Sequence, residues 1–268
     1  MLLCVDIGNT QIALGIYAAP DPGPDLARPP LVRDWRMRTD RHMTADELEV
    51  AVRGLLGPLA PEVGAIAALS TVPSLLRELR LLLDRRPGLP SVVVGPGVRT
   101  GVPLLVDNPR EVGADRVVNT LAAHRLFGTT CVVVDFGTST NIDVVSAKGE
   151  FLGGALAPGI EISLEALAAR AAALRTVELV APRSVIGKNT VECLQSGVLY
   201  GFAGQVDGLV RRIVAELGPA AAPVTVLGTG GLAPLMVGVS DTITEYVPDL
   251  TLLGLRLAYL RHTTPSRA

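Results

Sequence analysis

The segments Asp6-Ile7-Gly8-Asn9-Thr10 and Asp135-Phe136-Gly137-Thr138-Ser139-Thr140 share one pattern: an aspartate, an apolar residue, a glycine, and then amide or hydroxyl side chains. Each segment follows one apolar run and precedes another, which is typical of a β-hairpin with a polar turn. The two copies begin at positions 6 and 135 of a 268-residue chain. Because this separation is close to half the chain, the sequence predicts an internal duplication.

Similar elements are predicted around both turns. Thr44, followed by acidic residues and by apolar residues at helical spacing, predicts a capped helix over 45–56. The other predicted strands and helices alternate along the chain, as in a sheet covered by helices. We therefore expect an α/β protein with two mixed sheets, flanking helices and a central cleft. The expected domains are residues 1–118 and 119–268.

The two acidic turns suggest phosphate chemistry. A glycine lets backbone amides turn toward a phosphate, and a nearby carboxylate such as that of Asp6 can hold a hydrated magnesium ion. Two such turns facing each other would form a phosphate clamp. The alternative is a pair of ordinary hairpin turns, in which Asp, Asn and Gly are favoured by the backbone alone. A duplicated pattern favours the functional interpretation.

A glycine cluster, Gly228, Gly230 and Gly231, follows a predicted strand over 224–227 and precedes an apolar stretch. Glycines in this position let a ligand such as adenine or ribose approach the backbone at a helix start. A tight structural turn explains the same residues equally well. The chain contains neither the GxGxxG nor the GxxxxGK[ST] pattern, so the sequence supports neither a Rossmann nor a P-loop site.

An acid beside a base occurs in the segment NPREVGADR, residues 108–116, at the predicted start of a helix. Arg116 could pair with a substrate carboxylate, and Asp115 could accept a hydrogen bond from a hydroxyl. The alternative is a helix-capping aspartate and a surface arginine. A carboxylate is sufficient for phosphoryl transfer through a loose transition state, because the acceptor needs little deprotonation beforehand.

Bulk properties exclude several classes of protein. The formal net charge is −2, so no overall positive field exists to attract nucleic acid or an anionic membrane. Apolar runs are short, and the start of the chain has no basic leader, so we expect a cytoplasmic protein without membrane segments. Cys4, Cys131 and Cys193 are far apart, and we expect them to be buried and inert.

The combined motifs resemble those of type III pantothenate kinases. The matching segments are DIGNT at 6–10, NPxxVGADR at 108–116, DFGT at 135–138, GGALAPG at 153–159, GKNT at 187–190 and GTGG at 228–231. The resemblance covers essentially the whole chain. It implies the duplicated actin-like (ribonuclease H-like) fold and transfer of the ATP γ-phosphate to the terminal hydroxyl of pantothenate, the first step of coenzyme A biosynthesis.

The resemblance also implies residue roles. The segment that wraps the ATP phosphates corresponds to Asp6, Ile7, Gly8, Asn9, Thr10, Gln11, Ile12 and Ala13, and Thr138 corresponds to a further ATP contact. Asp6 would hold Mg²⁺ through the phosphates, and Asp135 an activating K⁺ or NH₄⁺. Asp115 corresponds to the proton acceptor. The pantothenate contacts correspond to Val106, Gly113, Ala114, Asp115, Arg116 and Thr190. Since the position of Thr190 lies near a dimer partner in the family, the resemblance implies a homodimer.

Two positions depart from the family pattern. Where the family usually has DxGTATT, residues 135–141 read DFGTSTN, which places Asn141 at the last position. Val106 stands where a Tyr is common. These departures keep two alternatives open: a catalytically weak or inactive regulatory homologue, and a different small-molecule kinase of the same superfamily.

Overall fold

The structure is a computed structural model that describes residues 1–18, 29–171 and 177–263. The chain divides into two compact units. The first unit takes in Met1–Pro103, Asp107–Leu126 and the chain from Leu250 onward, and the second takes in Leu104–Val106 and Phe127–Asp249. These units depart from the division expected from the sequence, because residues 119–126 and the last helix group with the first unit.

The sheet of the first unit has five strands in the order β3-β2-β1-β4-β5. Strand β1 pairs antiparallel with β2 and parallel with β4, so the sheet is mixed. Strands β2 and β3 are antiparallel, and β4 and β5 are parallel. The strand bounds are β1 Leu2–Ile7, β2 Gln11–Tyr17, β3 Leu31–Arg38, β4 Ala65–Ser70 and β5 Ser91–Val93.

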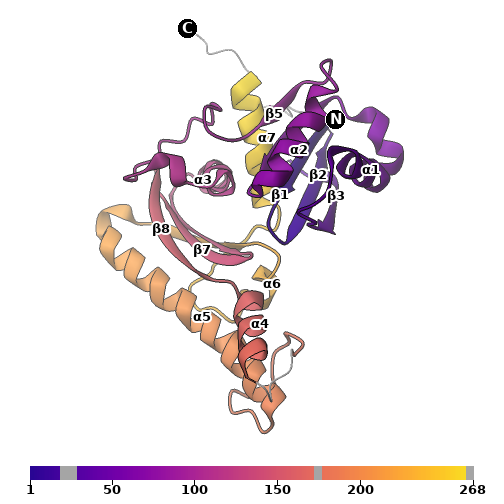
Figure 1. Cartoon of the computed structure of the whole chain (residues 1–268). Helices are drawn as coiled ribbons and strands as arrows, with labels where there is room; N and C mark the ends of the chain where they lie inside the picture. The colour runs from indigo at the N-terminus through magenta and orange to yellow at the C-terminus, as the bar shows by residue number, and fades with distance from the viewer. Residues whose placement is uncertain (19–28, 172–176, 264–268) are drawn as a thin grey trace. The chain divides into compact units, whose positions relative to one another are not determined.

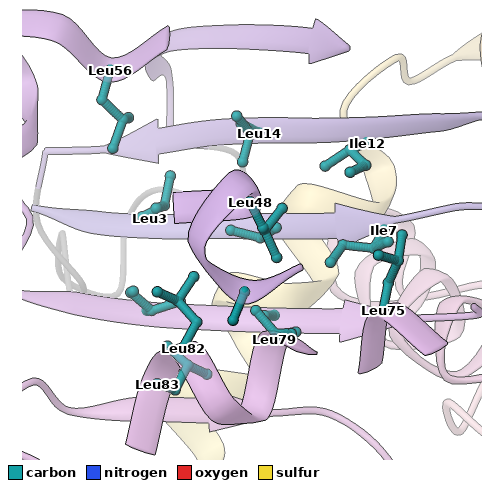
Figure 2. Packing of buried hydrophobic residues seen from close by; sticks show 14 of the residues in the cluster. Leu3, Ile7, Ile12, Leu14, Leu48, Leu56, Leu75, Leu79, Leu82 and Leu83 are labelled. Carbon is teal, nitrogen blue, oxygen red and sulfur yellow. The ribbon is translucent and has the colours of Figure 1, made fainter. Parts of the chain in front are cut away.

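Helices cover both faces of this sheet. Because side chains alternate along a strand, Leu3, Val5 and Ile7 of β1 pack in one core cluster while Leu2 and Cys4 pack in another. The first cluster contains α1 Ala45–Leu56 and α2 Pro73–Asp84, and the second contains α3 Ala114–Phe127 and α7 Leu250–Thr263. Figure 1 shows α1 and α2 together beside strands β1 to β3, and Figure 2 shows the first cluster from close by. The 3-10 helices η1 Gly57–Glu62 and η2 Pro109–Glu111 connect these elements.

The sheet of the second unit has the order β10-β9-β6-β7-β8. Strand β6 pairs antiparallel with β7 and parallel with β9. Strands β7 and β8 are antiparallel, and β9 and β10 are parallel. The strand bounds are β6 Thr130–Phe136, β7 Ser139–Val145, β8 Phe151–Pro158, β9 Val224–Thr229 and β10 Glu245–Tyr246. Helices α4 Ile160–Arg170, α5 Thr190–Leu217 and α6 Ala233–Met236 pack on one face of this sheet, and η3 spans Pro219–Ala221.

The two sheets repeat one topology. Reading β3-β2-β1-β4-β5 beside β8-β7-β6-β9-β10, each sheet has two antiparallel pairings followed by two parallel ones. The predicted duplication is therefore confirmed at the level of strand order and direction. Both acidic turns lie at the same place in the two sheets, between the central strand and its antiparallel neighbour.

Local signals explain where α1 begins and ends. The Thr44 side chain accepts a hydrogen bond from the Glu47 N–H, and the Glu47 carboxylate accepts one from the Thr44 N–H. This reciprocal cap satisfies donors that a helix start otherwise leaves unpaired. Gly57 ends the helix with φ of 52°, a conformation that glycine adopts without strain.

One expectation about the cysteines is wrong. Cys4 and Cys131 are buried, but Cys193 is exposed, because it lies in the first turn of α5 on a side that the core does not cover. In the part of the chain that the structure describes, no helix is long and apolar enough to span a bilayer.

Candidate active site

The first acidic turn joins β1 to β2. Asp6 lies opposite Ala13 in the ladder, and the Gly8 N–H donates to the Gln11 carbonyl at 3.0 Å. Since Asp6 follows Leu2 and Cys4 at a spacing of two, its side chain lies on the sheet face that α3 and α7 cover. Asp6 is half-buried, whereas Asn9, Thr10 and Gln11 at the tip are exposed. Ile7, Ile12 and Ala13 are buried and anchor the turn in the core.

Residues from two other segments fasten this turn. The Thr39 hydroxyl donates to the Gly8 carbonyl at 2.7 Å, and the Thr39 N–H donates to the Thr10 carbonyl at 2.9 Å. The Thr71 N–H donates to the Ile7 carbonyl at 3.0 Å. The Arg41 guanidinium donates to the Asn9 Oδ1 at 3.2 Å, which brings a positive charge to the tip. These hydrogen bonds connect the turn to the segment after β3 and to the residue after β4.

Thr39, Arg41 and Thr71 contact this turn but were not among the residues predicted from the sequence. A signal was present for the first two, because a three-stranded meander places the end of its third strand beside the first turn. Gln11 pairs with Arg38, so the next residue, Thr39, lies beside Thr10. Thr71 follows β4, and its position depends on a parallel pairing that no local pattern specifies.

The start of α3 carries Asp115 in its first turn. Burial raises the pKa of the Asp115 carboxyl, and the hydrogen bond and positive charge of Arg116 oppose that effect without cancelling it. A side chain at Gly113 would place its Cβ 2.4 Å from Asp115 Oδ1, so the glycine leaves the space that the carboxylate occupies. Asp115 is therefore a better proton acceptor than an ordinary aspartate, with an arginine as its neighbour.

The second acidic turn joins β6 to β7 and is one residue shorter than the first. Asp135 lies opposite Asn141, where Asp6 lies opposite Ala13 in the first unit. The Ser139 hydroxyl donates to the Asn141 Oδ1 at 2.9 Å, and Asn141 is buried. Asn141, which differs from the usual family residue, thus lies directly across the strand pair from Asp135.

Gly230 and Gly159 allow other segments to approach this turn closely. Gly230 has φ of 92°, and a Cβ there would lie 2.4 Å from Asp135 Oδ1 and 2.6 Å from the Phe136 carbonyl. A Cβ at Gly159, the residue before α4, would lie 2.3 Å from the Thr138 carbonyl. Close approach of backbone to Asp135 and Thr138 therefore requires glycine at both positions.

The remaining predicted residues take varied positions. Gly228 lies inside β9 rather than in the turn after it, since it pairs with Val134. Gly231 follows in the turn, and α6 after it has only the four residues Ala233–Met236. Val106 lies beside Gly153 of β8: a Cβ added at Gly153 would be 3.7 Å from Val106 Cγ1. Thr190 is exposed and begins α5, and the Asn189 side chain before it accepts from the Glu192 N–H at 2.9 Å.

The structure distributes the predicted residues over both units. Residues 6–13 and Gly113–Arg116, with Asp115, belong to the first unit. Val106, Asp135, Thr138, Thr190 and the three glycines 228, 230 and 231 belong to the second. Among the described residues no group of three or more His, Cys, Asp or Glu side chains could enclose a metal ion. Mg²⁺ is usually held by one or two carboxylates together with water and phosphate oxygens, and Asp6 and Asp135 each supply one carboxylate.

Comparisons with solved structures bear on the fold. The activator of the 2-hydroxyisocaproyl-CoA dehydratase from Clostridium difficile, with bound ADPNP, matches with a TM-score of 0.54 at 13% identity over 96% of this chain and 94% of that chain. The (R)-2-hydroxyglutaryl-CoA dehydratase component A of Acidaminococcus fermentans matches with a TM-score of 0.54 at 13% identity over 97% and 96%. Together with the repeated strand order, these neighbours confirm the duplicated actin-like fold.

Comparisons of sequence bear on the family. A family model described as type III pantothenate kinase matches residues 2–212. A type III pantothenate kinase from Saccharopolyspora erythraea is 73% identical over 264 residues, which cover 98% of this chain and 99% of that protein. One from Rhodococcus opacus is 61% identical over 265 residues, covering 98% and 96%. This chain therefore belongs to the type III pantothenate kinase family.

Proposed function

We propose that this chain transfers the γ-phosphoryl group of ATP to the terminal hydroxyl of pantothenate, which gives 4'-phosphopantothenate and ADP, the first step of coenzyme A biosynthesis. Membership of the family over nearly the whole chain supports the reaction. The observation that carries the mechanism is Asp115, whose pKa burial raises, at the start of α3 beside Arg116.

Asp115 accepts a hydrogen bond from the acceptor hydroxyl and aligns that oxygen for attack on the γ-phosphorus. As the new O–P bond forms and the bond to the bridging oxygen breaks, the hydroxyl proton passes to the Asp115 carboxylate, and ADP leaves with the bond electrons. Arg116 pairs with the pantothenate carboxylate, and Gly113 and Ala114 admit the substrate to the helix start. Val106 and Thr190 are proposed as further substrate contacts.

The two acidic turns serve the nucleotide. Residues 6–13, which are hydrogen-bonded to Thr39, Arg41 and Thr71, bind the phosphates, and Asp6 holds Mg²⁺ through them. Thr138 and the glycines 228, 230 and 231 contact ATP. Asp135 binds the monovalent cation, K⁺ or NH₄⁺, whose positive charge offsets phosphate charge nearby. We further propose a homodimer that acts in the cytoplasm, with no nucleic-acid or membrane partner.

A coupled ADP-release assay tests this proposal. Purified protein with ATP and magnesium should release ADP when pantothenate is added, and K⁺ or NH₄⁺ should increase the rate. Asp115→Asn should lower kcat by about 10²–10⁴-fold, because the proton acceptor is removed. Asp84→Asn makes the same chemical change at an exposed aspartate of α2 and should leave kcat unchanged.

The outcomes separate the alternatives. Turnover with another small alcohol or acid but none with pantothenate would favour a different kinase of the superfamily. Binding of ATP without turnover of any acceptor would favour a regulatory homologue. Full activity of Asp115→Asn would remove Asp115 from the mechanism while leaving the reaction itself intact.

A further inference from the structure

The first unit contains a cavity that the proposed reaction does not use. Its volume is about 530 Å³, within the range of roughly 300–1,000 Å³ that small-molecule sites occupy. Its walls come from the second halves of α1 and α2, from η1 and from the sheet. The lining residues include Leu3, Val52, Leu56, Ile66, Leu82 and Leu83. The space is only partly enclosed, and its lining is mostly apolar.

The cavity is separate from the phosphate turn. Leu3 and Ile66 are members of the cluster on the α1 and α2 face, whereas Asp6 lies on the opposite face of the sheet. Leu3 also precedes Gly8 by five positions, which is roughly 16 Å along an extended strand. Figure 2 shows Leu3, Leu56, Leu82 and Leu83 at one end of the core layer, and Ile7, Ile12 and Leu75 at the other.

Charged side chains form the solvent-exposed part of the lining, since 61% of the Arg53 side chain and 34% of the Arg86 side chain are exposed. Arg53 of α1 pairs with the Glu49 Oε1 at 3.2 Å, and Arg86, just after α2, forms a close ion pair with the same oxygen. All three residues line the cavity. Two guanidinium groups carry ten N–H donors, while one carboxylate offers about four acceptor sites. Glu49, Arg53 and Arg86 together therefore carry a net positive charge, and their unused N–H donors can bind a second anion.

An apolar interior with a cationic mouth matches one kind of molecule. We propose that this cavity binds a single-chain carboxylic acid of medium length, with the acyl chain against the leucines and the carboxylate on Arg53 and Arg86. Burial of the chain supplies affinity in proportion to the apolar area removed from water. The charge-assisted hydrogen bonds of the head supply orientation and discriminate against neutral chains of equal length.

Isothermal titration calorimetry of the full chain with hexanoate, octanoate and decanoate, each below its micellar concentration, tests the proposal. We expect one site per chain and an affinity that rises about fourfold per methylene until the cavity is full. Decanol should bind more weakly than decanoate. Absence of saturable decanoate binding, or an affinity independent of chain length, would overturn the proposal.

Matched variants locate the site. Arg53→Gln with Arg86→Gln should weaken decanoate at least about tenfold and leave decanol unchanged. Arg85→Gln is the control, because Arg85 also pairs with an acid of α1, Asp46, but does not line the cavity. Equal losses in the control and in the double variant would contradict the assignment.

A filling variant distinguishes the cavity from a surface for a second copy of the chain. Ala60→Phe should block decanoate, since Ala60 lines the wall formed by η1. If it instead abolishes self-association in sedimentation experiments and leaves decanoate binding intact, the face is an interface between copies and the proposal fails. No step measures phosphoryl transfer, so the result does not depend on the proposed function.

Discussion

At the scale of a single residue, the raised pKa of Asp115 predicts how the stability of the protein depends on pH. Because burial raises the pKa of this carboxyl above the ordinary value of about 3.9, the folded protein binds the proton more tightly than the unfolded chain does. Protonated Asp115 therefore increases the free energy of unfolding at low pH. This contribution disappears as the pH rises through the raised pKa. Asp115→Asn, which resembles the neutral carboxyl, should be the more stable protein at neutral pH.

Thermal unfolding of wild type and Asp115→Asn between about pH 4 and about pH 8 measures this effect. The difference in Tm should be small at the acid end and should grow toward neutral pH. A variant that is less stable than wild type at every pH would mean that the ionised carboxylate stabilises the fold, and the inferred direction would be wrong.

Positions that depend on neighbours along the chain could be predicted from the sequence. Asp115 and Arg116 follow Gly113 at a helix start, as predicted, and Gly113 makes room for the carboxylate. Thr39 and Thr71 could not be predicted, because their hydrogen bonds to the first turn depend on the pairing of strands distant in sequence. Their residue types alone say nothing about such contacts.

At the scale of the element, the cap of α1 predicts a stability change. Thr44→Ala removes the side-chain acceptor for the Glu47 N–H and the hydroxyl that donates to the Glu47 carboxylate. We expect a loss of about 1 kcal/mol and a fall in Tm of about 2–4 °C. Thr44→Ser keeps the hydroxyl and should retain most of the stability. Differential scanning calorimetry of wild type and the two variants measures this difference. Equal Tm values for Thr44→Ala and Thr44→Ser would contradict a capping role.

The bounds of α1 agree with the predicted 45–56 because a cap and a C-terminal glycine mark both ends. Strand β10 lacked such marks. It has only the exposed residues Glu245–Tyr246, which show no alternation, so the pattern gave no strand there. A helix was expected after the glycine cluster, and α6 Ala233–Met236 lies there but has only four residues. A short strand that relies on tertiary pairing is therefore not predicted from sequence patterns.

At the scale of the whole molecule, α7 is the element that sequence order misassigned. It follows the second unit in the chain, yet Leu252, Leu255 and Ala258 pack in the cluster with Leu2 and Cys4 of β1. Nothing in an apolar helical pattern states which sheet the helix will cover. The order of elements along the chain therefore predicted the two sheets but not the limits of the two units.

Close packing of α7 on α3 predicts opposite effects of one substitution at two helical glycines. A Cβ at Gly254 would lie 2.2 Å from the Val118 carbonyl, so Gly254→Ala should destabilise the protein by about 1–3 kcal/mol. A Cβ at Gly54 of α1 meets nothing within 4 Å, so Gly54→Ala should stabilise it by about 0.5–1 kcal/mol. Chemical denaturation measures both, and a neutral Gly254→Ala would contradict the contact.

The position of α7 also has a consequence for biosynthesis. Residues 1–126 emerge from the ribosome before α7 exists, so the apolar face formed by Leu2, Cys4 and Val118 lacks part of its cover during translation. The stretch 127–249 is complete earlier than the unit that began first. The second unit can thus fold during translation while the first unit still lacks α7. A chaperone would bind the uncovered apolar face of the first unit.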